Sequence, residues 1–333
     1  MTQRKSENSC SSDVPEKWRW KLRVFFSADV VGSTAYKASK AHDLSWAKDF
    51  TEFLREFPVA VDGAYSNLPK GSIDKCERMT PWKFSGDELL FHVELRSYTE
   101  SATHIAAFKR AVVSHSDKWK VKKTPLSLKA TAWMAGFPVT NREIVFRERG
   151  NDELDFIGPS IDLGFRIATF SSTRRFVLSP DLALTLLDAV HRLDLKWDEF
   201  QVFLHGKEEL KGVNDGKPFP IVWLDMDDGV GSLEDELLGV KNSFSPHIIR
   251  KYLQEFLDET PKMRRPFIFG DGDQRYADLP SDFDEKRAIL MADTERMYSE
   301  EEEVPAEGDS VPLSDPKKRP PQETPNEDAS PAK

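Results

Sequence analysis

Between residues 21 and 225 the sequence alternates between apolar, β-rich segments and segments with helical periodicity, in an order that restricts the possible folds. Strands are predicted at 21–31, twice within 79–95, at 126–137, twice within 143–156, at 175–178 and at 221–225, and helices within 35–57, 102–113 and 158–170. Turns at 85–87 and 150–152 join neighbouring strands as antiparallel hairpins. The order predicts an α+β fold, with a ferredoxin-like or palm-type antiparallel sheet and helices packed on it, rather than a doubly wound parallel sheet.

The composition limits the classes of protein to which the chain can belong. Hydrophobic residues make up 39% of the 333 positions, and 22 Phe and 8 Trp are enough for a large core. The formal net charge of −10 argues against a nucleic-acid partner, since binding to phosphate backbones requires basic surfaces. Two cysteines, Cys10 and Cys76, and seven scattered histidines predict neither a disulfide framework nor a structural zinc site.

The two ends of the chain differ from its middle. Residues 1–18 are polar and are predicted to be a flexible N-terminus, and no run of about 18 apolar residues predicts a membrane span. We therefore expect a cytoplasmic protein with no membrane partner. Residues 226–298 are predicted to be a helical and loop appendage with helices at 233–240 and 246–258, and residues 299–333 an acidic, proline-rich, disordered tail.

The first segment with chemical potential is FSADVVGST, at 26–34, where a strand ends at Asp29 and a turn containing Gly32 enters a helix. Such a turn directs backbone N–H groups at an anion, and a carboxylate beside it can bind a divalent cation. Taken alone, the pattern is also that of an aspartate that only caps a turn.

The second segment is KFSGDELLF, at 83–91, which places Asp87 in a hairpin turn between apolar strands. Gly-Asp turns are common in purely structural hairpins. Together with Asp29, however, Asp87 supplies the second carboxylate that a two-metal phosphoryl-transfer site needs, because Mg²⁺ and Mn²⁺ prefer oxygen ligands.

The third segment is DFIGPSIDLGFR, at 155–166, in which Asp162 and Arg166 are four residues apart and share one face of a predicted helix. They can form a simple exposed ion pair. Alternatively, Arg166 faces the charge that develops on a transferring phosphorus, a frequent use of arginine in phosphoryl chemistry.

Together these segments resemble class III nucleotide cyclases, the family of adenylate and guanylate cyclases, over roughly residues 20–225. ELKGV at 209–213 followed by IVW at 221–223 is similar to the closing strand of that family. The resemblance implies a catalytic domain at 19–225 that converts a nucleoside triphosphate to its 3′,5′-cyclic monophosphate and pyrophosphate with two divalent cations, Mn²⁺ or Mg²⁺. It implies catalytic roles for Arg166 and Asp162, metal binding by Asp29, Val30 and Asp87, and nucleotide binding by Phe26, Val31, Gly32, Ser33, Thr34, Lys83 and Asp155.

One residue departs from the family pattern. Asp162 stands where the family usually has an asparagine that helps to orient the ribose. A carboxylate there can still accept a hydrogen bond from a ribose hydroxyl, but it adds negative charge near a polyanion, so the contacts to the sugar and the transition state are in question.

The resemblance also implies a head-to-tail homodimer, in which each composite site takes metal carboxylates from one protomer and base and transition-state residues from the other. Lys83 with Asp155 is typical of adenine recognition, whereas the compact layout is similar to the stand-alone cyclases of Pycsar antiphage systems. We expect UTP as the substrate and cyclic UMP as the product, with ATP second and CTP third. The product is expected to act as a second messenger in bacterial antiphage defence, read by a separate cyclic-nucleotide effector.

Four bulky aromatic residues are expected near the site, where they either narrow the pocket toward a pyrimidine or belong to the core: Phe25, Phe26, Tyr36 and Trp82. Two other classes of protein share parts of the pattern. An inactive cyclase-like binding module is disfavoured by the intact Asp29, Asp87 and Arg166, and a polymerase palm domain by the net charge of −10.

Overall fold

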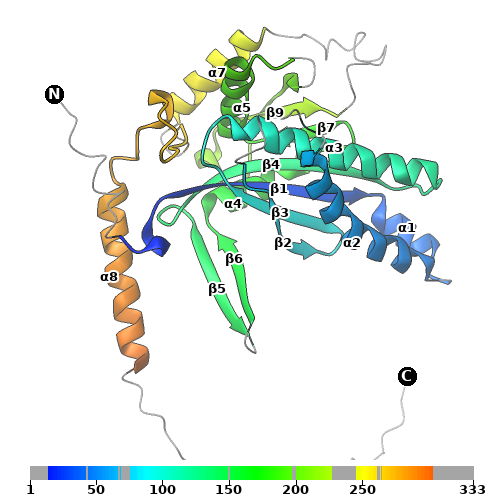
Figure 1. Ribbon diagram of the computed structural model, residues 1–333, viewed down its shortest axis with the longest axis horizontal. Coiled ribbons are helices and arrows are strands. Elements are labelled where there is room, and N and C mark those ends of the chain that lie inside the picture. The colour runs from blue at the N-terminus through cyan, green and yellow to red at the C-terminus, as the bar shows by residue number, and fades with distance from the viewer. Residues whose placement is uncertain are drawn as a thin grey trace, which may run out of the picture. The chain divides into compact units, whose positions relative to one another are not determined.

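The computed structural model (Figure 1) describes residues 14–42, 44–66, 68, 76–148, 151–196, 200–226, 245–260, 263 and 265–302. The chain forms two compact units, 1–290 and 291–333, and the sheets lie within the first. The strands are β1 Lys21–Val31, β2 Thr80–Ser85, β3 Glu88–Glu94, β4 Ser127–Phe137, β5 Arg142–Glu148, β6 Asn151–Ile157, β7 Arg175–Leu178, β8 Val202–Glu208 and β9 Phe219–Asp225. The α-helices are α1 Ser33–Ser39, α2 Ser45–Ser66, α3 Glu100–Val121, α4 Pro159–Ile167, α5 Pro180–Leu193, α7 Pro246–Glu259 and α8 Phe283–Glu302.

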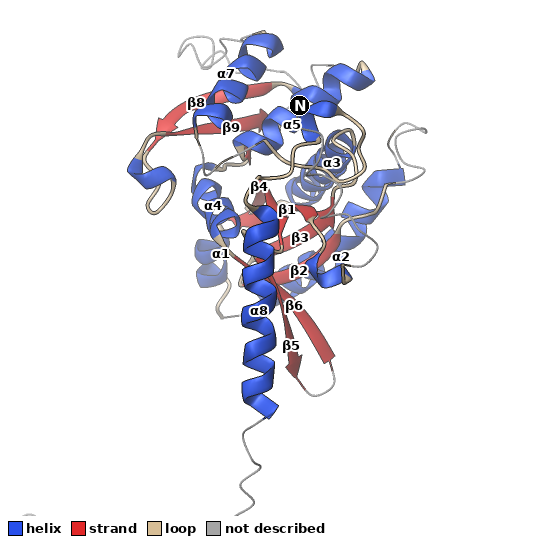
Figure 2. Cartoon of the chain, turned by 90° about the vertical axis from the view of Figure 1, so that its left-hand side faces the viewer, coloured by secondary structure: helices blue, strands red, loops and turns tan. Residues whose placement is uncertain are grey.

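Seven strands form one sheet in the order β2-β3-β1-β4-β7-β9-β8. The first four strands are antiparallel to their neighbours and, with α2 and α3 as connections, have the βαββαβ order of a ferredoxin-like core. β7 joins β4 in parallel, and β9 and β8 extend the sheet antiparallel. The predicted α+β class is confirmed. β5 and β6 form a separate hairpin that projects from the main sheet in both Figure 1 and Figure 2.

The central strand β1 has two buried faces, because successive side chains of a strand point to opposite sides. On one face Phe26 packs against Phe108 of α3, with ring centroids 4.9 Å apart. On the other face Phe25 stacks on Trp133 of β4 at 5.6 Å and meets Phe156 of β6 edge-on at 5.0 Å. Helices α2 and α3 therefore cover one face of the sheet, while the β5–β6 hairpin and α4 cover the other.

The segment that contains α7 packs on the same unit as the sheet. α7 lies against α5 and buries Leu253 and Leu257. The buried carboxylate of Asp188 in α5 forms ion pairs with Arg250 at 2.5 Å and Arg275 at 2.7 Å, and accepts a hydrogen bond from Tyr276 at 2.8 Å. Residues 246–276 are thus held on α5 by apolar contacts and by one buried, multiply paired carboxylate.

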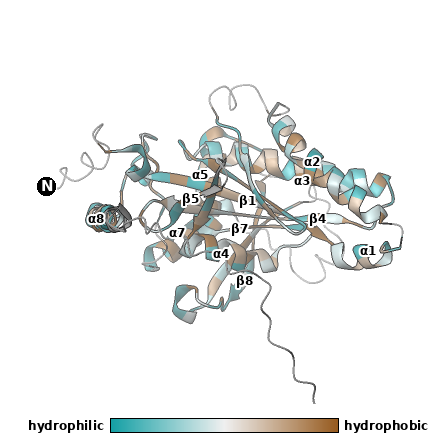
Figure 3. Ribbon diagram, turned by 90° about the horizontal axis from the view of Figure 1, so that it is seen from below, coloured by the Kyte–Doolittle hydropathy of each residue, from teal (hydrophilic) through white to brown (hydrophobic). Residues whose placement is uncertain are grey.

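Three elements are not predicted from the sequence. Almost every residue of α5 between Pro180 and Val190 is buried, so no polar face marks its helical period. In β8 an irregularity between Leu204 and Gly206 interrupts the alternation. α8 is largely hydrophilic (Figure 3) and its few apolar residues form no continuous stripe.

Other boundaries differ by a few residues from those predicted. The helical segment 35–57 is two helices, α1 and α2. Asn151 and Asp152, predicted to be part of a turn, belong to β6. α8 continues to Glu302, past the predicted start of the tail at Ser299. The predicted helix at 233–240 and the rest of the tail lie outside the described residues. None of the described helices is both long enough and apolar enough to cross a lipid bilayer.

Candidate functional site

The two aspartates predicted to bind metal lie on neighbouring segments at one end of the sheet. Asp29 in β1 lies directly across from Glu88, the first residue of β3, and Asp87 immediately precedes Glu88. The Gly86–Asp87 turn that joins β2 to β3 places Gly86 at φ +70°, a conformation that favours glycine. The antiparallel register thus brings together two acidic residues that are far apart in the sequence.

Asp29 belongs to the face of β1 that is covered by the hairpin and α4, because it shares the alternation of Phe25 and Ser27. Two residues of the predicted set have side chains on the opposite face. Phe26 is fully buried against α3, and Val30 is buried as well. Their side chains are therefore core residues, and only their backbone groups are placed to contact a ligand on the Asp29 face.

Two further charged residues, Lys129 and Glu88, lie next to Asp29 on the neighbouring strands. The Nζ atom of Lys129 in β4 lies 2.9 Å from Oδ2 of Asp29. The hydroxyl of Ser27 donates a 2.5 Å hydrogen bond to Oε1 of Glu88. Burial raises the pKa of Glu88, and the negative charges of Asp29 and Asp87 raise it further, against the opposing effects of Ser27 and Lys129. The negative charge concentrated here favours a bound cation.

The turn after Asp29 has the predicted strand–turn–helix form. Gly32 adopts φ +84° at the N-cap of α1, and a Cβ atom there would lie 3.2 Å from the carbonyl oxygen of Pro125. Ser33 is buried, Thr34 is exposed and Val31 is half-buried. The first backbone N–H groups of α1 have no acceptor within the helix, so they are available to an anion.

Lys83 and Asp155, predicted as a base-recognition pair, also lie together. Nζ of Lys83 in β2 is 2.8 Å from Oδ1 of Asp155 in β6, and Nε1 of Trp82 donates to the same oxygen at 2.9 Å. The Lys83 ammonium lies 4.3 Å from the centroid of the Trp82 ring. Burial raises the pKa of Asp155, but the hydrogen bonds from Lys83 and the Phe156 backbone outweigh it, so the net shift is downward.

Asp162 and Arg166 lie exposed on α4, and both line a cavity of about 690 Å³. No ion pair joins them, although both belong to the described residues. Lys211 of the predicted LKG segment, and Arg265 and Lys286 from beyond residue 246, line the same cavity. Asp29, Asp87, Lys83 and Asp155 do not line it, so the chain presents separate groups of predicted functional residues.

Two glycines determine where α4 lies. A Cβ atom on Gly164 would lie 2.1 Å from the ring of Trp133, so only glycine lets α4 approach β4 this closely. Gly158, at φ +140°, lies against the buried Asn141, whose side chain accepts a hydrogen bond from the Ser160 N–H at 3.0 Å. These contacts fix the helix that carries Asp162 and Arg166.

The predicted aromatic residues divide between core and site. Phe25 and Phe26 have no exposed surface, and Tyr36 is buried with its hydroxyl donating to Asp49. Trp82 alone of the four is partly exposed and contacts predicted site residues.

Lys129 and Glu88 are absent from the predicted set. Glu88 follows Asp87 directly, but the position of Lys129 depends on strand register, which the sequence pattern does not reveal.

No model of a known protein family matches the sequence, and no curated protein matches it. Solved structures with a similar fold include the adenylyl cyclase CyaB from P. aeruginosa, at 14% identity over 63% of this chain and 95% of that chain, with a TM-score of 0.46. The guanylyl cyclase Cya2 matches at 13% identity over 62% and 91%, with a TM-score of 0.42. The guanylate cyclase domain of RhGC from Catenaria anguillulae, in complex with GTP, matches at 12% identity over 62% and 97%, with a TM-score of 0.41. At these values the similarity by itself assigns no activity to this chain.

Proposed function

We propose that the chain is a class III nucleotide cyclase that converts a nucleoside triphosphate to a 3′,5′-cyclic monophosphate and pyrophosphate. The observation that carries this proposal is the strand register that pairs Asp29 with the residue next to Asp87, beside a glycine turn whose amides suit a phosphate. It is supported by the contact between Lys83 and Asp155 and by the exposed position of Arg166.

The donor set near Asp29 fits two hard divalent cations. Asp29 and Asp87 supply carboxylate oxygens and Val30 a backbone carbonyl, the ligand types that Mg²⁺ and Mn²⁺ prefer. When bound, the cations would lower the pKa of the 3′-hydroxyl and balance the charge of the triphosphate.

The protein residues would position the nucleotide for an intramolecular displacement. The turn at 32–34 would hold phosphate oxygens, and Lys83 with Asp155 would bind the edge of the base. The 3′-hydroxyl loses its proton to solvent water, and its oxygen bonds to the α-phosphorus while the bond from that phosphorus to the bridging oxygen of the β-phosphate breaks, so that pyrophosphate leaves. Arg166 would stabilise the charge on the phosphoryl oxygens in the transition state.

A homodimer with composite sites accounts for the separation of these groups within one chain. The cavity lined by Asp162 and Arg166 does not include Asp29 or Asp87 of the same protomer. In a twofold head-to-tail dimer, Arg166 and the Lys83–Asp155 pair of one protomer would face Asp29 and Asp87 of its partner, giving two equivalent sites.

For the base, we propose UTP and hence cyclic UMP, acting as a second messenger in bacterial antiphage defence through a separate effector. Trp82, which contacts both Lys83 and Asp155, is the residue best placed to restrict the size of the base. ATP is the second candidate, because a lysine and an aspartate in contact form the pair typical of adenine recognition in the family, and CTP is the third.

The decisive experiment incubates the full chain with each of the four NTPs and Mn²⁺ or Mg²⁺ and identifies products by mass spectrometry. The expected result is one cyclic monophosphate with an equal amount of pyrophosphate, abolished in Asp29→Asn and Asp87→Asn. A matched control is Asp62→Asn, an exposed carboxylate paired with Arg78. Folded, dimeric protein that gives no cyclic product with any NTP would refute the proposal, and a product other than cyclic UMP would refute only the choice of base.

A further inference from the structure

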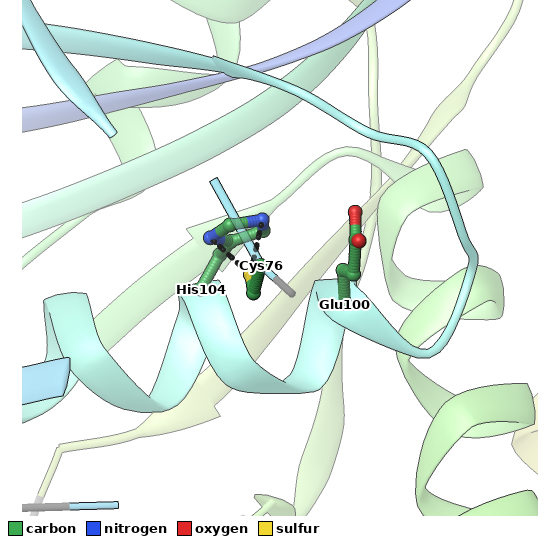
Figure 4. A group of neighbouring side chains, drawn as sticks. All are labelled: Cys76, Glu100 and His104. Carbon is green, nitrogen blue, oxygen red and sulfur yellow. Dashed lines mark hydrogen bonds between the residues drawn. The ribbon is translucent and has the colours of Figure 1, made fainter. Parts of the chain in front are cut away.

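A second group of metal-ligating side chains lies on the helix-covered side of the sheet. Cys76, Glu100 and His104 each offer a ligand atom, and these three atoms lie within 4.8 Å of one another. Figure 4 shows Glu100 and His104 on successive turns of α3, with Cys76, which precedes β2, beside the imidazole. Because α3 packs on the Phe26 face of β1, this group is separated by the sheet from Asp29.

We propose that Cys76, Glu100 and His104 bind a zinc-type divalent cation, distinct from the cations at Asp29 and Asp87. Sulfur and imidazole ligands select Zn²⁺ over Mg²⁺ and Mn²⁺. Three protein ligands leave a fourth tetrahedral position for water. The proposal does not depend on the nucleotide cyclase activity.

The distance between sulfur and nitrogen supports this choice of ion. Sγ of Cys76 lies 3.4 Å from Nε2 of His104. Tetrahedral zinc with bonds of about 2.3 Å to sulfur and about 2.05 Å to nitrogen holds these two atoms roughly 3.5 Å apart. The separation of the two atoms matches zinc, but Sγ also lies 3.8 Å from Nδ1 and hence over the ring, so the Cys76 side chain would rotate toward the Nε2 lone pair when the cation binds.

The surroundings of His104 prepare it as a ligand. Its side chain is fully buried, where a neutral ring is favoured over a charged one. Nδ1 lies 2.7 Å from the hydroxyl of Tyr65, which leaves Nε2 as the ring nitrogen available to a cation. A ligating histidine usually has its second ring nitrogen fixed by such a hydrogen-bond partner.

Glu100 and Cys76 lie in negatively charged surroundings that favour a cation. Glu100 and Cys76 place a carboxylate and a thiol next to one another, and a bound cation would offset the charge of both groups when the thiol ionises. Oε2 of Glu100 accepts the backbone N–H of Arg96 at 2.9 Å, which orients the carboxylate. Its Oε1 makes no hydrogen bond with the described residues.

The sequence alone does not predict this cluster as a zinc site. The sequence separates Cys76 from His104 by 28 positions, without the short spacing typical of zinc motifs. The ligands become neighbours only because the residues leading into β2 lie against the first turns of α3. Such a cation would fix the segment that continues into Trp82 and Lys83.

The test measures metal binding in the absence of nucleotide. A variant with Cys10→Ser, Asp29→Asn and Asp87→Asn leaves Cys76 as the sole thiol and removes the carboxylates of the other proposed cation site. After treatment with a chelator it is titrated with Zn²⁺, followed by elemental analysis, and with Co²⁺, followed by thiolate-to-cobalt charge-transfer absorption. We expect one metal per chain and a thiolate band, both lost on adding Cys76→Ser.

Two further variants separate metal binding from an effect on folding. Tyr65→Phe retains all three ligands but loses the partner of Nδ1, and should bind Zn²⁺ roughly tenfold more weakly. Asp117→Asn alters an exposed carboxylate of α3 that pairs with Lys120 and should bind normally. Circular dichroism confirms that each variant is folded.

Zinc binding that persists in folded Cys76→Ser protein would overturn the proposal. So would a protein with Cys10→Ser, Asp29→Asn and Asp87→Asn that binds neither metal. In that case the hydroxyl of Tyr65 donates to Nδ1, the proton of the neutral ring is on Nε2, and the imidazole has no lone pair for a cation.

Discussion

The ammonium of Lys129 lies 2.9 Å from the carboxylate of Asp29, because these residues face one another directly across β1 and β4. Both side chains are partly exposed, at 28% and 30%. Lys129 is therefore the protein's own counter-charge to a residue that we propose to bind a divalent cation. Any cation that binds Asp29 has to compete with it or share the carboxylate with it.

Replacement of Lys129 by methionine should strengthen binding of Mn²⁺. A partly exposed ion pair contributes about 1 kcal/mol, so removing the competing ammonium should lower the dissociation constant by about fivefold. Calorimetric titration with Mn²⁺ checks this. Lys120→Met, which removes an exposed partner of Asp117, is the matched control and should leave the affinity unchanged. Equal affinities in both variants would show that Lys129 does not influence the cation site.

Two inactive variants should restore activity when they are mixed. In a heterodimer of Asp29→Asn and Arg166→Ala protomers, one composite site carries both substitutions and the other carries neither. Random exchange of protomers produces heterodimers in about half of the dimers, each with one intact site, so about a quarter of wild-type activity should return. The measurement is cyclic-nucleotide formation after co-refolding. Mixtures that stay inactive although exchange is demonstrated would place both residues in the same site.

Substitution of Lys83 by methionine, or of Asp155 by asparagine, should alter substrate choice more than stability. The two side chains are 39% and 32% exposed, so their ion pair stabilises the fold by about 1 kcal/mol or less. Loss of a hydrogen bond to the base should raise KM for the preferred NTP by about tenfold and change the ratio of activities among the four NTPs.

The comparison requires kcat and KM for all four NTPs together with chemical unfolding curves. Arg78→Met, which breaks the exposed pair with Asp62, should leave the substrate preference unaltered. An unchanged preference in both site variants would remove Lys83 and Asp155 from base recognition.

Acid should destabilise the protein through His115. This histidine is buried among aromatic rings, where burial, followed by the charge of Lys118, lowers its pKa to about 4. The unfolded chain binds a proton at about pH 6.5. Between these values the unfolded state holds more protons, so stability is fully present above about pH 6.5 and falls by up to about 1.4 kcal/mol per pH unit toward pH 4.

His115→Phe, which preserves an aromatic side chain, should flatten this dependence in urea unfolding measured from pH 7 to pH 4. His247→Gln, at an exposed position of α7, serves as the control and should retain the wild-type slope. A slope that is the same in His115→Phe and wild type would assign the acid sensitivity to other groups.

Removal of the charge of Asp188 should loosen the segment that contains α7. This carboxylate is 1% exposed and pairs with both Arg250 and Arg275, so Asp188→Asn leaves two cations without their buried partner. The expected loss is about 3–5 kcal/mol in the free energy of unfolding. Hydrogen exchange should increase in α7 first. Asp62→Asn, in an exposed pair, should cost less than about 1 kcal/mol, and a similarly small loss in Asp188→Asn would contradict this account.

The sequence is most informative where local chemistry dictates structure. The Gly86–Asp87 turn, the strand ending near Asp29 and the Gly158–Pro159 helix start are all predicted, because turn residues and strand periodicity act over a few positions. From these the ferredoxin-like core follows by the order of its elements.

Features that depend on distant neighbours are not predicted. The position of Lys129 opposite Asp29 requires the register of β1 and β4, and the close approach of Gly164 to Trp133 requires the position of α4. The helix α5 is buried on nearly all sides, so its sequence lacks the polar stripe that marks a surface helix. The pairing of Cys76 with His104 is likewise a property of the tertiary structure alone.

The residues of the candidate site lie on strands that the main sheet holds to different degrees. Asp29 is on β1, which has partners on both sides, whereas Lys83 belongs to the edge strand β2 and Asp155 to a hairpin outside the main sheet. Substitutions in β2 or in the β5–β6 hairpin can therefore change the ligand preference while β1 and Asp29 stay constant.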